Sequence, residues 1–243
     1  MSSDTQSESV VAVKPKVLTE DLGKIFEMAI CIASTIEYDD GEFKYNMEEA
    51  RKLAYRITTG LLERFKPLKH TAKKQNRYDF QGTDLTTNEP SPLSAKSVKK
   101  DGKVCPQVIG QPTKRTFCKH FGLDETTDVS KIKEHIISNI TTMLFSYSTT
   151  TFDAPILYYN KHTRRLSFIK QKTEIDWNAH TVEFLHITKN KIWNESTTIK
   201  IGGIAIGEFQ VHNHRNCVKF RWMFEKLLAH PSFCDHFDVV ELP

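Results

Sequence analysis

Three polar residues near the middle of the chain have the types and spacing of a metal-dependent phosphodiesterase site. Asp84 lies in a turn-rich segment, and ten residues later Ser94 and Lys96 stand two positions apart in the segment 93–98, which we expect to be a strand. Side chains alternate along a strand, so Ser94 and Lys96 share one face. A cation held by Asp84 would lower the pKa of an attacking water, and Lys96 would position that water or stabilise charge in the transition state.

Magnesium is the cofactor that this pattern favours. Mg²⁺ binds through one or two carboxylates together with phosphate oxygens and water, so a sparse set of acids is sufficient. The sequence contains neither GxxxxGK[ST] nor GxGxxG, and the GxSxG, HExxH and CxxC spacings are also absent. These absences exclude many nucleotide-binding proteins, hydrolases, zinc proteases and redox proteins.

The same residues resemble the motif of the PD-(D/E)xK nucleases, and among these the type II restriction endonucleases. The likeness rests on Asp84 followed by the segment 93–97 (LSAKS), on the segment 103–111 (KVCPQVIGQ) and on the helix 22–27 (LGKIFE). Ser94 stands where the family usually has Glu or Asp. The resemblance implies metal ligation by Asp84 and Glu27, and four catalytic residues: Glu27, Asp84, Ser94 and Lys96.

A rival acidic site lies nearer the C-terminus. Glu208 and Gln210 share a strand face, and this E-x-Q pair resembles a variant of the same nuclease motif with Gln in place of Lys. Asp153 is the candidate for its first acid, fifty-five residues upstream. The site Asp153, Glu208 and Gln210 is therefore the alternative to the one around Lys96.

The segment 208–221 also suits the reading of duplex DNA, which is the role we favour for it. Gln, His, Asn and Arg carry hydrogen-bonding groups that match base edges in the major groove, while Lys and Arg contact phosphates. We expect phosphate contacts from Lys219 and Arg221. The candidates for base reading are Gln210, His212, His214 and Arg215.

The distribution of charge fits a partner that is a polyanion. The net charge is only +4, but residues 64–119 carry thirteen Lys and Arg against four acids, and residues 161–221 carry eleven against five. Residues 17–63 instead carry ten acids against five bases. Such patches are typical of nucleic-acid binding, although solvated surface lysines give the same count. A non-catalytic DNA- or RNA-binding protein is the alternative to a nuclease.

The hydrophobic pattern predicts a mixed α/β fold, with a central mixed β-sheet flanked by helices as in restriction endonucleases. We expect helices that begin near 19, 46, 130 and 222. A Lys-Lys-Asp-Gly turn at 99–102 predicts a β-hairpin over 93–109. Further strands are expected at 156–159, 166–170, 182–187 and 197–211.

The chain is expected to form one domain over 17–243 after a flexible tail at 1–16. Residues 17–125 would be its catalytic part and 150–243 a strand-rich part for DNA recognition. No signal peptide and no run of about 18 apolar residues is present, so we expect a cytoplasmic protein with five reduced cysteines. Cutting both strands of a palindrome needs two active sites, so a homodimer is expected.

Overall fold

The computed structural model describes residues 19–39, 41–72, 76–100, 102–105 and 113–243. The expected tail at 1–16 lies outside these residues, as does most of the segment 104–109 that was expected to be the second strand of a hairpin. Within the described ranges no helix is long and apolar enough to cross a bilayer. All five cysteines are free thiols.

The two N-terminal helices form where the periodicity predicts them. They are α1 (Thr19–Ser34) and α2 (Met47–Thr58), and the side chain of Asn46 caps α2 by accepting the Glu49 N–H at 3.0 Å. Each helix buries one apolar stripe, which is the usual source of helix stability in a folded chain. The stripes pack on each other and on one face of the first sheet through residues that include Ile25, Phe26, Ala29, Leu53 and Ile57.

The first sheet has six strands in the order β1-β2-β3-β5-β6-β11. Neighbours are antiparallel except β3 and β5, which are parallel. The sheet is therefore mixed and central, because α1 and α2 cover one face and a second core covers part of the other. Its strands are β1 (Phe65–His70), β2 (Phe80–Asp84), β3 (Glu89–Val98), β5 (Ile156–Asn160), β6 (Arg165–Gln171) and β11 (Phe237–Leu242).

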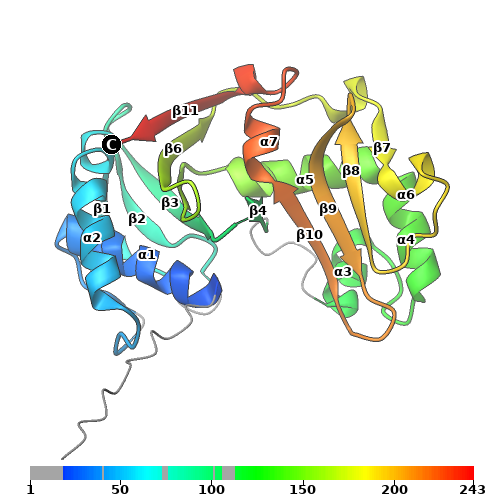
Figure 1. The fold of residues 1–243 in the computed structure, drawn as a ribbon, viewed down its shortest axis with the longest axis horizontal. Helices are drawn as coiled ribbons and strands as arrows, with labels where there is room; N and C mark the ends of the chain where they lie inside the picture. Colours follow the sequence, from blue (N-terminus) through cyan, green and yellow to red (C-terminus); the bar gives the residue numbers. More distant parts are fainter. Residues whose placement is uncertain (1–18, 40, 73–75, 101, 106–112) are drawn as a thin grey trace, which may run out of the picture.

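The second sheet has five antiparallel strands in the order β4-β10-β9-β8-β7. Figure 1 shows it on the right, with the six-stranded sheet on the left and α5 crossing the middle of the molecule. The strands are β4 (Lys103–Val104), β7 (Val182–Phe184), β8 (Ser196–Ile201), β9 (Ile204–Val211) and β10 (Val218–Met223). The remaining α-helices are α3 (Lys114–Phe121), α4 (Val129–Ser138), α5 (Ile140–Phe152), α6 (Leu185–Thr188) and α7 (Phe224–Leu228).

The predicted class, a mixed α/β fold with a mixed central sheet flanked by helices, is confirmed. The predicted hairpin over 93–109 is wrong, because β3 pairs with β2 and β5 whereas β4 pairs with β10 in the other sheet. The helix expected from residue 130 is two helices, α4 and α5, and the segment 197–211 is the hairpin β8–β9. The helix expected from residue 222 begins two residues later, as the short α7.

The division of the chain between the two sheets does not follow the expected catalytic and recognition parts. Strands β5, β6 and β11 come from the C-terminal part but complete the six-stranded sheet, and β4 comes from the N-terminal part but joins the five-stranded one. Both sheets therefore depend on residues from both halves of the chain. The segment that leaves β3 passes directly into β4, so the two sheets are linked next to Lys96.

Candidate active site

Lys96 forms an ion pair with Asp79, which comes directly before β2. One Asp79 carboxylate oxygen, Oδ2, accepts the backbone N–H of Ala95 at 2.7 Å and lies 3.6 Å from the Lys96 ammonium. The Asp79 and Lys96 side chains are 20% and 17% exposed. The hydrogen bond to β3 therefore fixes the carboxylate beside a lysine while both remain open to a ligand.

Helix α1 carries a second carboxylate, Glu27, whose charge acts on Asp79. Its Oε2 accepts a hydrogen bond from Nε2 of His70 at 3.2 Å and lies 3.4 Å from the Lys24 ammonium. Glu27 interrupts the apolar stripe of α1 at a position where the stripe meets the end of β1. The side chain is 13% exposed, so this acid also faces a space that is only partly open to solvent.

The charges of these groups influence one another. Burial raises the pKa of the Asp79 carboxyl above its ordinary value, and the nearby charge of Glu27 raises it further. The Lys96 ammonium and the Ala95 N–H oppose the rise, as does His70. Two carboxylates that repel each other in a partly desolvated place attract a cation, because a cation relieves both the repulsion and the loss of hydration.

Ser94 lies on the face of β3 that also carries Lys96, as alternation predicts. Ser94 is buried, and its backbone N–H donates to the Pro155 carbonyl at 3.0 Å. The neighbours on the other face of β3, Leu93 and Ala95, pack against the core beneath α1. The hydroxyl of Ser94 is thus positioned at the base of the Lys96 side chain.

Asp84 lies at the opposite end of β2, and this corrects the expected pairing of Asp84 with Lys96. Asp84 is in register with Glu89, seven positions before Lys96 on β3, a separation of about 23 Å at the rise of an antiparallel strand. Its carboxylate instead accepts from Lys170 at 2.6 Å and from the Thr86 N–H at 2.9 Å. Burial raises the pKa of Asp84, but these bonds outweigh it and hold the pKa below the ordinary value.

The residues around Lys96 fit a divalent cation. Glu27 and Asp79 supply hard carboxylate oxygens, which Mg²⁺ prefers, and their mutual repulsion favours a bound cation. In the described part of the chain no three His, Cys, Asp or Glu side chains stand together at metal-ligand spacing. A cation held by these two carboxylates would take its remaining ligands from water and from phosphate oxygens.

One face of the second sheet is polar and points away from the adjoining core. Phe209, Val211, Phe220 and Trp222 point into that core, so the residues that alternate with them point the other way. In the register of β9 and β10, Gln210 is opposite Lys219 and Glu208 is opposite Arg221. We call this surface the polar sheet face; it carries Lys103, Glu208, Gln210, Lys219 and Arg221.

Glu208 is the centre of the polar sheet face. Its carboxylate accepts hydrogen bonds from Arg221 at 2.5 Å, from Lys103 at 3.0 Å and from Gln210 at 3.0 Å. Burial raises the pKa of Glu208, but the bonds from Lys103 and Arg221 outweigh it and hold the pKa below the ordinary value. Its oxygens are thus already neutralised by two cations, which argues against Glu208 as a metal ligand.

The turn between β9 and β10 extends the polar sheet face with the expected base-reading residues His212, His214 and Arg215. His212 Nδ1 lies 3.3 Å from the Glu195 carboxylate. The Lys133 ammonium, on α4, lies within hydrogen-bond distance of Asn213 Oδ1 at 3.3 Å. These contacts hold the start of the turn against the segment that enters β8.

Asp153, the expected first acid of the rival site, ends α5. Its carboxylate accepts from the Tyr78 hydroxyl and from Arg77, each at 2.5 Å. These partners differ from those of Glu208, which lies on the second sheet. Asp153 thus holds the segment before Asp79 through Arg77 and Tyr78. The alternative site of Asp153, Glu208 and Gln210 is therefore divided between two places.

Cys105 links the two polar regions. Desolvation raises the pKa of the Cys105 thiol, and the nearby positive charges of Arg221, Lys219 and Lys96 oppose that rise. The Cys105 thiol, just after β4, is therefore near cations of both β3 and β10.

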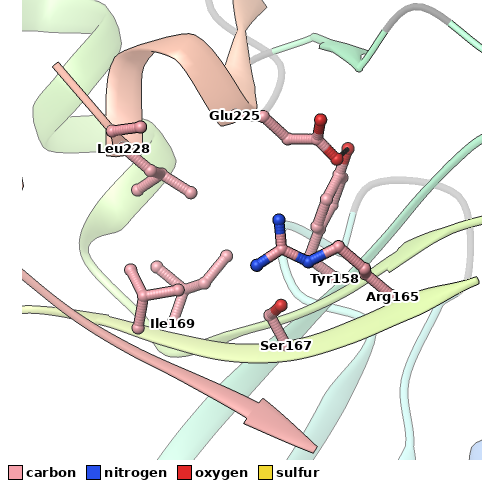
Figure 2. Close-up of a pocket in the computed structure, with 8 residues that line it drawn as sticks. Tyr158, Arg165, Ser167, Ile169, Glu225 and Leu228 are labelled. Atoms are coloured by element: carbon pink, nitrogen blue, oxygen red, sulfur yellow. Dashed lines mark hydrogen bonds between the residues drawn. The ribbon is translucent and has the colours of Figure 1, made fainter. Parts of the chain in front are cut away.

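A small pocket lies where helix α7 packs on strands β5, β6 and β11 of the first sheet. Figure 2 shows Glu225, Tyr158 and Arg165 on one side of it and Ile169 and Leu228 on the other. It encloses about 140 Å³. Asn160 and Tyr158 donate to Glu225 at 2.6 and 3.3 Å, which ties α7 to β5. The pocket shares no residue with the cluster around Lys96.

Comparison with known proteins supports the resemblance stated from the motif. Over 227 residues, which are 93% of this chain, the sequence is 42% identical to the type II restriction enzyme CviAII of Paramecium bursaria Chlorella virus 1. The chain resembles a type II restriction enzyme. It spans 64% of the length of that relative. No protein-family model matches the chain, and no solved structure matches it.

Two residues of the site, Asp79 and His70, were not expected from the sequence. The segment that contains them is rich in Lys and other polar residues, which favours a polar loop over the strands β1 and β2 that the structure has. One local signal was present. Asp79 stands between Tyr78 and Phe80, and aromatic residues are enriched in strands, as Phe80 at the start of β2 illustrates.

Proposed function

We propose that this chain is a Mg²⁺-dependent endonuclease that cleaves double-stranded DNA at a short specific sequence, as a type II restriction enzyme does. The observation that carries the proposal is the Asp79 carboxylate held 3.6 Å from the Lys96 ammonium, with the charge of Glu27 near enough to raise the Asp79 pKa. The similarity to a type II restriction enzyme over 93% of the chain supports it. With Asp79 as the first acid, the order Asp79, Ser94 and Lys96 resembles the PD-(D/E)xK pattern.

Each group at the site has a role in phosphodiester hydrolysis. Asp79 and Glu27 would hold the cation, and Ser94 would hold a water or contribute a weak ligand. A bound Mg²⁺ would neutralise the phosphate and lower the pKa of the attacking water. The Lys96 ammonium would bind a non-bridging phosphate oxygen, where it stabilises the charge that grows as water adds to phosphorus and the leaving oxygen departs.

The polar sheet face would bind and read the duplex. Lys219 and Arg221, on β10, would hold the phosphate backbone of the duplex. Gln210 carries an amide that pairs with adenine through two hydrogen bonds in the major groove. The turn residues His212, His214 and Arg215 would make further base contacts.

We further propose that two copies of the chain act together. A palindromic duplex has two-fold symmetry, and a homodimer places one active site on each strand. The expected assembly is therefore a homodimer in the cytoplasm. Sedimentation with and without a DNA duplex would measure it, and a protein that stays monomeric in both conditions would contradict this part.

Plasmid digestion tests the proposed activity against its alternative. The full chain is incubated with a plasmid of known sequence and Mg²⁺, with EDTA in place of Mg²⁺ as the control. Discrete fragments whose ends map to one short sequence are expected. A gel shift without cleavage, with Mg²⁺ present, would overturn the nuclease and support the non-catalytic DNA- or RNA-binding protein.

A further inference from the structure

The ring of His70 is buried and makes two directed hydrogen bonds. Its side chain is fully buried, at the end of β1. Nδ1 accepts the backbone N–H of Asp39 at 3.0 Å, so this nitrogen carries no proton. The proton of the neutral ring is therefore on Nε2, which donates to Glu27 Oε2 at 3.2 Å.

Aromatic packing fixes the plane of the His70 ring. Tyr38 stacks on it with ring centroids 4.7 Å apart and an interplanar angle of 16°, and Phe80 lies at 5.0 Å on a tilt. The ring thus has its orientation set by two rings and by one backbone N–H. Its remaining polar atom can serve a single acceptor, the Glu27 carboxylate.

From this geometry we infer that His70 is a positioning residue, which holds the Glu27 carboxylate in the orientation that completes the cation site with Asp79. The inference rests on the proposed function and deepens it. With Oε2 engaged by His70, the second oxygen of Glu27 is left for a cation. Partners that orient a metal-binding group are worth about 10–100-fold in metal affinity or activity when they are removed.

A pair of amide variants separates the two hydrogen bonds of the ring. In His70→Asn the amide oxygen takes the place of Nδ1 and keeps the bond from Asp39, but the side chain is too short to donate to Glu27. In His70→Gln the longer side chain carries an N–H donor to the place of Nε2. Tyr38→Leu is the packing control, because it removes the stacking and leaves both hydrogen bonds.

Two quantities are measured. The first is Mn²⁺ binding to the protein without DNA, monitored by the loss of the free-ion EPR signal. The second is the Mg²⁺ concentration for half-maximal plasmid cleavage. We expect His70→Asn to weaken Mn²⁺ binding and to raise the required Mg²⁺ concentration, each by about tenfold or more. His70→Gln should restore most of the loss, and Tyr38→Leu should lower the melting temperature without changing the metal dependence. Rescue by Gln distinguishes positioning from packing.

The outcomes distinguish the inference from the proposed function. If the wild-type chain cleaves and the folded His70→Asn variant keeps wild-type metal binding and Mg²⁺ dependence, the positioning role is wrong. If Asn and Gln weaken metal binding equally, or if Tyr38→Leu has the same effect as Asn, the role is packing and the inference also fails. If the wild-type chain binds Mn²⁺ but cuts no DNA, the proposed function fails while the metal-binding difference still tests His70.

Discussion

The carboxylate of Asp79 lies 3.6 Å from the ammonium of Lys96 and accepts the N–H of the residue before that lysine. The Asp79 carboxylate is therefore hydrogen-bonded to β3, the strand that carries Lys96. The hydrogen bond to β3 therefore keeps the Asp79 carboxylate and the Lys96 ammonium at a fixed separation.

The first prediction compares two aspartates of the same strand region. Asp79→Asn should abolish Mg²⁺-dependent cleavage, because it removes the anionic oxygen beside Lys96, while DNA binding survives. Asp84→Asn should cut at close to the wild-type rate but lose about 1–3 kcal/mol of stability, since Lys170 then faces a neutral group. Initial rates of plasmid cleavage and urea unfolding curves measure the two effects. Normal cleavage by Asp79→Asn with loss of cleavage by folded Asp84→Asn would reverse the assignment.

The second prediction concerns acid stability. The pKa of Glu208 lies below its ordinary value of 4.5 in the folded chain, so its contribution to stability is complete above that value. The contribution is lost as the pH falls through the lowered folded pKa. Glu208→Gln should cost about 1–3 kcal/mol at neutral pH, because Lys103 and Arg221 lose a charged acceptor.

The difference in stability between the wild type and Glu208→Gln should therefore shrink as the pH is lowered below 4.5. Melting curves over a pH series measure it. A difference that stays constant down to the lowest pH at which both proteins fold would show that the Glu208 carboxylate contributes no charge-dependent stability.

The third prediction separates base reading from phosphate binding on the polar sheet face. Gln210→Ala should cost about 1–3 kcal/mol of discrimination at one base pair of the site, because an amide pairs with one base edge. Lys219→Ala should weaken binding to all sequences alike and reduce the slope of log affinity against log salt by about 1. Competition binding with single-base variants of the mapped site, over a salt series, measures both. Equal effects of the two variants on all sequences would remove Gln210 from base reading.

The fourth prediction uses two glycines whose surroundings differ. A Cβ on Gly82, in β2, would lie 2.3 Å from the Lys66 carbonyl oxygen and 2.5 Å from the Phe65 ring, so strand β1 must move. Gly82→Ala should therefore destabilise the chain by about 1–3 kcal/mol or more. Around the same position of Gly23, inside α1, the described residues place no atom within 4 Å apart from its chain neighbours and the backbone of its own helix. Gly23→Ala should stabilise by about 0.5–1 kcal/mol, since alanine costs less entropy in a helix.

Urea unfolding of the two glycine variants beside the wild type measures this contrast. Gly23→Ala also serves as the control for the general effect of adding a methyl group. Equal stability of Gly82→Ala and the wild type would show that β1 does not pack against β2 as closely as the register indicates.

The sequence by itself determined the elements whose signals are local. The apolar stripe of α1 and the Asn46 cap of α2 lie within a few residues, and strict alternation puts Ser94 and Lys96 on one face of β3. Alternation likewise placed Gln210 on the face of β9 that points away from the buried side of Phe209. These features need only the geometry of a single helix or strand, so reading the residues in order is enough to predict them.

Only the tertiary structure decided which strands pair and which acid meets Lys96. Pro90 and Pro92 obscure the first half of β3, yet they are tolerated because that half pairs with β2 alone and has an open edge on its other side. Asp79 and Asp84 are close in sequence, but they lie at opposite ends of a strand. The register that β2 takes against β3 selects between them, and register is fixed by hydrogen bonds and packing between residues far apart in the chain.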